Sequence, residues 1–282
     1  MHHSDSATVT TVDTLAKLLD VCGELRASEQ VDERAVTGCS FDSRAVSAGD
    51  VFFCKGAAFK LAFLRMALDA GAVAFVCEES LVESLEPLAQ ESGAAMLVVD
   101  SVRTAMALLP PEVYDRPDHD VKIVGITGTK GKTTAAFMLQ SIIKAAGESC
   151  GMIGSVSTDD GIECYESTNT TPEAPEVWRH IANCRTSGRQ SMVMEVSSQA
   201  LKYQRVENLP FDVACFLNIG RDHISPIEHP TFEDYFESKL RIFDQAKTAV
   251  VNLGTDEVDR VLEAASTAER LVTVGVEHPE AS

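Results

Sequence analysis

Runs of apolar, β-branched residues alternate along the chain with segments in which apolar residues recur at every third or fourth position. The runs predict buried strands, and the periodic segments predict amphipathic helices. Strands are predicted at residues 36–44, 50–55, 73–79, 94–100, 121–127, 151–157, 191–197, 212–219, 249–253 and 271–276. Helices are predicted at residues 12–22, 61–72, 101–109, 133–147, 175–188, 232–246 and 256–265. This alternation predicts an α/β fold with mostly parallel sheets.

Residues 110–120 interrupt the alternation with three prolines and four acidic residues, a composition typical of a linker. A chain of 282 residues is long enough for two domains of ordinary size. We therefore predict one domain over residues 1–117 and a second over residues 118–282.

Composition and charge exclude several classes of function. The formal charge of -19 disfavours a general nucleic-acid binder, whose surface would be basic, so an anionic substrate requires a local positive pocket. The chain has no apolar run of membrane-spanning length, and we expect no secretory leader. Its eight cysteines show no CxxC pair or zinc-like spacing, which favours free thiols in a reducing compartment. We expect a cytoplasmic protein without a membrane span.

The stretch "VGITGTKGKTTAAF", residues 124–137, places glycines and lysines between a predicted strand and a predicted helix. Such a loop directs backbone N–H groups at a phosphate, while Lys132 can pair with the β- and γ-phosphates and Thr133 can reach Mg²⁺. A strict Walker spacing would need glycine in place of Ile126, and the alternative is a glycine-rich turn without a ligand. The predicted nucleotide-binding residues are Gly128, Thr129, Lys130, Gly131, Lys132, Thr133 and Thr134.

Two further predicted strands end next to residues of types that can bind metal ions. One apolar run ends at Glu195, and another ends just before Asp222 and His223. The carboxyl ends of parallel strands share one edge of a sheet, so Glu195 and His223 are candidates to hold Mg²⁺ beside the loop. The alternatives are a helix-start carboxylate for Glu195 and a surface histidine for His223.

Lys239 occupies an unusual position in the predicted helix 232–246. It falls on the same helical face as Phe232, Tyr235 and Phe236, which is the face expected to be buried. A lysine there must extend to solvent, pair with an anion or be chemically altered.

Five motifs in order resemble the central ATPase domain of the Mur ligase family: "GITGTKGKTT", "STNTTPE", "MEVSSQAL", "NIGRDH" and "YFESKLRIF". The segments "VTGCSFDSRAVSAGDVFFCKG" and "ALDAGAVAFVCEE" resemble the N-terminal UDP-binding domain of the same enzymes. The resemblance covers nearly the whole chain and is closest to the MurE type, which adds the third residue of the peptidoglycan stem peptide. It implies a UDP-sugar-binding domain followed by a P-loop domain with a mostly parallel sheet.

The resemblance also implies roles for single residues. ATP would lie on the loop, Mg²⁺ would be held by Thr133, Glu195 and His223, and Lys239 would be carbamylated to support a second metal ion. The catalytic residues would be Lys132, Lys239 and His223. The implied substrate contacts are Ser43 near the uridine diphosphate, with Asn169, Thr170, Thr171, Ser197 and Arg205 at the muramoyl peptide.

The implied reaction is ATP-dependent amide synthesis on UDP-N-acetylmuramoyl-L-alanyl-D-glutamate through an acyl phosphate. Gln199 stands where the family often has histidine, and "ISPIEHPTFEDYF" follows His223 in place of the usual leucine-aspartate. The family's C-terminal domain, which selects the amino acid, is expected to be missing or supplied by a partner chain. The alternatives are a folylpolyglutamate- or cyanophycin-type ligase, and a catalytically incomplete nucleotide-binding regulatory protein.

Overall fold

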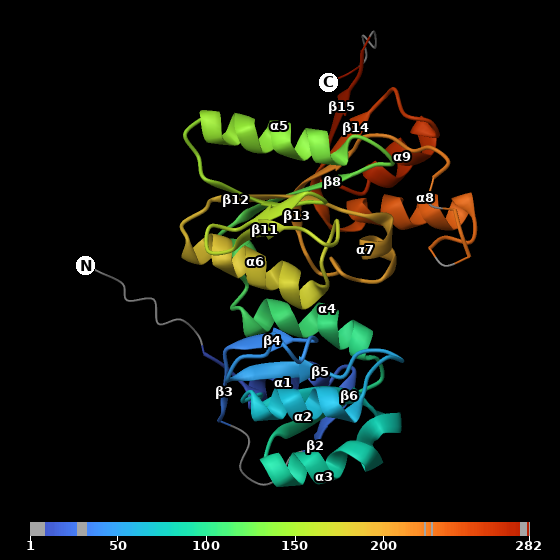
Figure 1. Ribbon diagram of the computed structural model, residues 1–282. Coiled ribbons are helices and arrows are strands. Elements are labelled where there is room, and N and C mark those ends of the chain that lie inside the picture. Colours follow the sequence, from blue (N-terminus) through green and yellow to red (C-terminus); the bar gives the residue numbers. More distant parts are fainter. Residues whose placement is uncertain (1–8, 27–32, 223, 227, 277–280, 282) are drawn as a thin grey trace. The chain divides into compact units, whose positions relative to one another are not determined.

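The structure is a computed structural model that describes residues 9–26, 33–222, 224–226, 228–276 and 281 (Figure 1). The chain divides into two compact units. The first comprises the described residues up to Arg116 together with Ala174–Arg179, and the second comprises Pro117–Glu173 and His180–Ser282. Both are α/β units with mostly parallel sheets, so the predicted fold class is confirmed.

The first unit contains a five-stranded sheet in the order β2-β7-β6-β5-β4. Strands β4 to β7 run parallel, and β2 pairs antiparallel with β7. Its strands are β2 (Gly23–Arg26), β4 (Gly38–Ser40), β5 (Asp50–Phe53), β6 (Ala74–Glu78) and β7 (Ala95–Val99), while β1 (Thr10–Thr11) and β3 (Ala35–Val36) pair separately. Its helices are α1 (Val12–Leu19), α2 (Leu61–Asp69), α3 (Val82–Ser92) and α4 (Val102–Val113), with the 3-10 turn η1 (Glu79–Leu81).

Successive residues of these strands face opposite sides of the sheet, and both sides are buried. Val51 and Phe53 pack with α1 and α4, whereas Phe52 packs with α2 and α3. This two-sided burial explains why the strands read as continuous apolar runs.

The second unit contains an eight-stranded sheet in the order β11-β10-β9-β12-β8-β13-β14-β15. The strands from β9 to β15 in this order are parallel, and β10 and β11 form an antiparallel edge. They are β8 (Lys122–Thr127), β9 (Cys150–Ile153), β10 (Ser157–Asp159), β11 (Cys164–Glu166), β12 (Ser191–Glu195), β13 (Phe211–Phe216), β14 (Ala246–Asn252) and β15 (Arg270–Val274).

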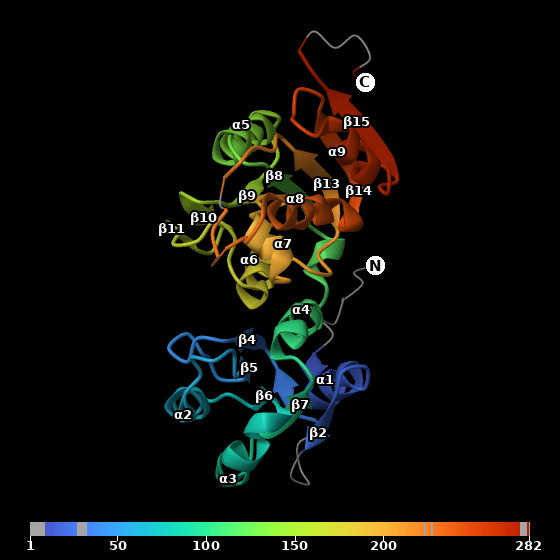
Figure 2. The same cartoon turned by 90° about the vertical axis from the view of Figure 1, so that its right-hand side faces the viewer.

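Helices cover both faces of this second sheet. Helix α5 lies on one face, while α7 and α8 lie on the opposite face (Figures 1 and 2). The helices of this unit are α5 (Lys132–Ala145), α7 (Ser198–Lys202), α8 (Phe232–Leu240) and α9 (Val258–Ala265), with the 3-10 turns η2 (Pro117–His119) and η3 (Arg241–Gln245). The residues of α6 (Ala174–Thr186) are divided between the two units after Arg179. Gly125 of β8 is required by packing, because an added Cβ would lie 2.7 Å from the ring of Phe211.

The observed helices differ from the sequence predictions in two places. Helix α4 does not end at residue 109 but continues through Pro110 and Pro111 to Val113, and all three of these residues are buried. Burial of this apolar segment outweighs the hydrogen bonds that the prolines cannot donate. Helix α3 was not predicted, because Pro87 and acidic residues obscure its buried stripe of Leu85, Leu88 and Ala89.

The other differences between the predicted and the observed elements concern short strands and a short helix. Strands β1, β2, β10 and β11 span two to four residues each, and α7 spans five, which leaves too few positions for a periodic pattern. The eight cysteines are free. Among the described residues, no helix has both the length and the apolar character needed to cross a membrane.

Candidate active site

The loop between β8 and α5 has the backbone shape of a phosphate cradle. Gly128 and Gly131 have φ values of 150° and 85°, which side-chain-bearing residues rarely adopt. Asn218, beyond the end of β13, fixes the loop: its Oδ1 accepts from Lys130 N at 2.9 Å and its Nδ2 donates to Lys130 O at 3.0 Å. The first-turn N–H groups of the 14-residue helix α5 follow directly.

Some side chains of this loop are buried in contacts within the protein, and others face solvent. Thr129 is buried and its Oγ1 lies 3.0 Å from the hydroxyl of Tyr235. Lys130 is exposed and its Nζ pairs with Asp222 at 2.6 Å. Thr134 is exposed in the first turn of α5. Lys130 and Thr134 are therefore open to a ligand that approaches from solvent.

Lys132 points back over the loop. Its Nζ donates to Gly128 O at 2.9 Å, and burial lowers the pKa of this lysine below its ordinary value. An ammonium held against the loop carbonyls can move a short distance to meet a phosphate group.

Glu195 and Thr133, predicted as metal-binding residues, are in direct contact. Glu195 is the last residue of β12 and only 2% exposed, and its Oε2 accepts from Thr133 Oγ1 at 2.9 Å. Its Oε1 accepts from the backbone N–H of Ser155 at 2.8 Å. The third predicted metal-binding residue, His223, lies outside the described residues.

Lys239 lies on the buried face of α8 and does not extend to solvent. It is 2% exposed, its Nζ donates to Gly128 O at 3.0 Å, and the nitrogen lies 4.9 Å from the centroid of the Tyr235 ring. Burial and the nearby charge of Lys132 lower the pKa of Lys239 to about 7. Thus Lys132 from α5 and Lys239 from α8 both contact the same carbonyl oxygen.

The residues predicted to contact the muramoyl peptide gather around a pocket of about 240 Å³ beside these lysines. Its lining includes Lys132, Asn169, Thr170, Thr171, Ser197, Arg205 and Lys239. Two of these residues also hold the backbone: Thr171 Oγ1 donates to Glu195 O at 2.9 Å, and Ser197 caps α7. Arg205 donates to Thr171 O at 3.0 Å and forms an ion pair with Glu173 at 3.1 Å. These contacts orient the guanidinium toward the edge of the pocket.

Two further pockets lie elsewhere on the chain. One of about 410 Å³ borders the phosphate loop and is lined by Thr129, Lys130, Asn218, Ile219, Gly220, Arg221, Asp222, Gly254, Thr255 and Asp256. The other, about 530 Å³, belongs to the first unit and is lined by Phe41, Asp42, Ser43, Arg44, Phe63 and Met66. The predicted uridine-diphosphate contact, Ser43, lies in this second pocket.

A buried polar network beside the peptide pocket was not predicted. His229 is fully buried, with Nδ1 2.6 Å from Asp234 Oδ2 and Nε2 2.9 Å from Ser198 Oγ. Lys202 donates to the same Asp234 oxygen at 2.7 Å. These contacts join α7, which follows the strand of Glu195, to α8, which carries Lys239. The only sequence signal was a histidine shortly before the helix cap at Thr231.

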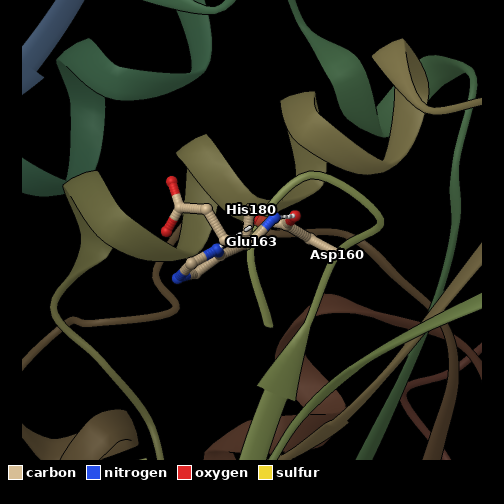
Figure 3. A group of neighbouring side chains, drawn as sticks. All are labelled: Asp160, Glu163 and His180. Carbon is tan, nitrogen blue, oxygen red and sulfur yellow. Dashed lines mark hydrogen bonds and ion pairs between the residues drawn. The ribbon is translucent and has the colours of Figure 1, made fainter. Parts of the chain in front are cut away.

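Asp160, Glu163 and His180 form a second cluster that was not predicted (Figure 3). Their potential ligand atoms lie within 4.8 Å of one another, but the two buried members already have hydrogen-bond partners. His180 Nδ1 is 2.6 Å from Asp160 Oδ2, and His180 Nε2 is 2.9 Å from the hydroxyl of Tyr165. Asp160 Oδ1 accepts from the N–H groups of Ile162 and Glu163. The cluster therefore fastens the β10–β11 turn to α6.

Comparison with protein families gives a match to the Mur ligase middle domain over residues 126–282. UDP-N-acetylmuramoyl-L-alanyl-D-glutamate--L-lysine ligase of Streptococcus suis (strain 05ZYH33) is 37% identical over 266 residues, which cover 92% of this chain and 53% of that protein. The ligase of the same name from Enterococcus faecalis is 42% identical over 234 residues, covering 82% of this chain and 44% of that protein. The chain thus spans about half the length of these relatives.

Solved structures support the fold. A structure of UDP-N-acetylmuramoyl-L-alanyl-D-glutamate--2,6-diaminopimelate ligase superposes with a TM-score of 0.75 at 22% identity, covering 97% of this chain and 54% of that one. A structure of MurF ligase from Thermotoga maritima in complex with ADP gives a TM-score of 0.58 at 23% identity, covering 86% of this chain and 51% of that one.

Proposed function

The chain belongs to the Mur ligase family, and we propose that it is the nucleotide- and UDP-sugar-binding part of a MurE-type, ATP-dependent amide ligase. The proposed acceptor is UDP-N-acetylmuramoyl-L-alanyl-D-glutamate, which the names of the relatives specify. The observation that carries the proposal is the convergence of Lys132, Thr133, Glu195 and Lys239 around the loop at Gly128. Because those two relatives are named as L-lysine ligases, L-lysine is the first amino acid to test.

The phosphate loop is proposed to bind the triphosphate of ATP. Backbone N–H groups at the start of α5 point toward the loop and favour negative charge, and Lys132 adds an ammonium that exchanges its carbonyl contact for phosphate oxygens. The neighbouring 410 Å³ pocket offers space for the remainder of the nucleotide.

The donor set fits a magnesium ion. Thr133 Oγ1 and the Glu195 carboxylate are hard oxygen donors that already lie 2.9 Å apart, and Mg²⁺ takes one or two protein oxygens together with phosphates and water. His223 is proposed as a further ligand. When bound, Mg²⁺ would neutralise negative charge on the transferring phosphoryl group.

The proposed reaction has two steps. An oxygen of the substrate carboxylate attacks the γ-phosphorus and ADP leaves, which gives an acyl phosphate. The amine of the amino acid then attacks the acyl carbon, loses a proton and expels inorganic phosphate, forming the amide. In both steps Lys132 would stabilise developing phosphate charge, while Arg205, Asn169 and Thr170 would hold the peptide at the pocket.

Lys239 is proposed to carry a carbamate. The neutral amine attacks the carbon of CO₂ and loses a proton, so a buried cation becomes an anion. A buried ammonium with a pKa of about 7 supports this chemistry, because much of the amine is unprotonated at neutral pH. The product would be an oxygen ligand for a second metal ion, and it would lie beside the ammonium of Lys132.

The first unit is proposed to bind the UDP-sugar. Its 530 Å³ pocket combines the apolar side chains of Phe41, Phe63 and Met66 with the hydroxyl of Ser43 and the guanidinium of Arg44. Aromatic and apolar side chains suit a pyrimidine ring, and an arginine suits a diphosphate.

Calorimetric titration of the 282-residue chain with Mg·ATP tests the nucleotide assignment. We expect saturable binding that Lys132→Ala weakens by at least about tenfold, since one charge-assisted contact is lost. Lys144→Ala is the matched control, because this exposed lysine lies in the last turn of α5, at the end of the helix opposite the loop. Equal loss of affinity in both variants, or no binding by the unaltered chain, would refute the assignment.

A further inference from the structure

The turn after β9 is built against the Glu195 carboxylate. An added Cβ at Gly154 would lie 2.6 Å from Glu195 Oε1, so a side chain at residue 154 would displace the carboxylate or the turn. The next residue, Ser155, donates its backbone N–H to the same oxygen at 2.8 Å. The turn at the end of β9 therefore also positions the Glu195 carboxylate, in addition to the strand ends that the sequence indicated.

The hydroxyl of Ser155 bridges two parts of the site. Its Oγ lies 3.2 Å from Glu195 Oε2 and 3.0 Å from Thr170 Oγ1. The Ser155 hydroxyl is the donor in both contacts and carries a single proton, so it donates either to Glu195 or to Thr170. The two acceptors therefore compete for the same proton.

The two acceptors belong to the sites of different proposed ligands. Thr170 lines the 240 Å³ pocket for the muramoyl peptide, whereas Glu195 contacts Thr133 at the proposed magnesium site. A ligand that takes over the hydrogen bond to Thr170 leaves the Ser155 proton to Glu195 and so strengthens the hydrogen bond that orients this carboxylate. Coupling of this kind acts in both directions, so each ligand should change the affinity for the other.

We propose that Ser155 is a positioning residue that couples the peptide-binding loop at Thr170 to the carboxylate of Glu195. Its backbone N–H and its hydroxyl hold both oxygens of that carboxylate, and its hydroxyl transmits the state of the loop. The inference rests on the proposed function, because it requires magnesium nucleotide and muramoyl peptide to occupy these two places.

Isothermal calorimetry of the full 282-residue chain with a non-hydrolysable ATP analogue provides the test. The dissociation constant is measured in EDTA, in Mg²⁺, and in Mg²⁺ with UDP-N-acetylmuramoyl-L-alanyl-D-glutamate. We expect Mg²⁺ to tighten nucleotide binding and the dipeptide substrate to tighten it further. In Ser155→Ala the magnesium increment, which is the tightening of nucleotide binding by Mg²⁺, and the further increment from the dipeptide substrate should each be about tenfold smaller. The dissociation constant in EDTA should stay unchanged.

Three variants separate positioning from general damage. Ser155→Thr keeps the hydroxyl and should restore both increments, and Gly154→Ala should reduce the magnesium increment by crowding Glu195. Ser187→Ala is the control, because this part-buried hydroxyl donates to the main-chain carbonyls of Asp160 and Cys184.

The results separate failure of the proposed function from failure of the coupling role of Ser155. If the unaltered chain binds nucleotide without any magnesium increment, the proposed function fails and the inference fails with it. If the unaltered chain shows both increments and Ser155→Ala shows them undiminished, the coupling role is overturned while the proposed function stands. Should Ser155→Ala not fold, as judged by circular dichroism, an unchanged magnesium increment in Gly154→Ala overturns the inference instead.

Discussion

Single residues near the phosphate loop show how burial prepares a side chain for chemistry. Lys239 and Lys132 share the carbonyl of Gly128, and neither is fully solvated. A buried ammonium beside a second cation is unfavourable, so the neutral amine is favoured at Lys239. The sequence indicated the buried position, because Lys239 follows Tyr235 and Phe236 at helical spacing. It could not indicate the shared carbonyl, which depends on how α8 packs against the loop.

Carbamate formation at Lys239 should depend on pH in a defined direction. Its pKa is lowered to about 7, so the reactive neutral amine increases as pH rises through that value. With ¹³C-labelled bicarbonate, we expect a carbamate signal in the NMR spectrum that is weak at pH 6 and strong at pH 8. Lys239→Ala should abolish the signal. Lys247→Ala should not, because Lys247 is half-exposed and paired with Asp212. A signal that survives Lys239→Ala would contradict the assignment.

Secondary-structure elements position the site through their ends. Strands β8, β9, β12 and β13 are neighbours in one sheet, and their carboxyl ends or the turns that follow carry the loop, Ser155, Glu195 and Asn218. Apolar runs predicted these strands and therefore predicted that Glu195 would lie near the loop. Ser155 was missed because an ordinary serine after a glycine carries no chemical pattern. The network of His229 was missed because its partner Ser198 on α7 lies 31 positions away in the sequence.

The Asp160 network should stabilise the β10–β11 turn in a pH-dependent way. Burial opposes ionisation of Asp160, but hydrogen bonds from His180 and Asn183 outweigh it and lower its pKa. A lowered folded-state pKa means that this stabilisation is present above about pH 4, the unfolded value, and is lost as pH falls through the folded value.

Asp160→Asn should therefore lower the free energy of unfolding by about 1–3 kcal/mol at pH 7, measured by urea denaturation. The difference from the unaltered chain should narrow toward pH 3. Asp256→Asn removes an exposed carboxylate and should have little effect. Equal effects of the two substitutions at pH 7 would show that the network does not stabilise the fold.

At the scale of the whole chain, a strongly acidic protein concentrates cations where anions are proposed to bind. The formal charge is -19, yet Lys132 and Arg205 line one pocket and Lys130 borders the next. The acidic composition predicted that an anionic substrate would need such a local positive pocket. The relatives are about twice as long as this chain, so ligation stays a proposal to be tested.

A crystal structure of the chain grown with Mg²⁺ and a non-hydrolysable ATP analogue would show whether Thr133 and Glu195 hold the metal ion of a nucleotide on the loop. We expect a metal ion about 2.0–2.1 Å from Thr133 Oγ1 and from a Glu195 carboxylate oxygen, with Lys132 on the terminal phosphates. A nucleotide bound away from the loop, or a metal ion that contacts neither Thr133 nor Glu195, would contradict this expectation.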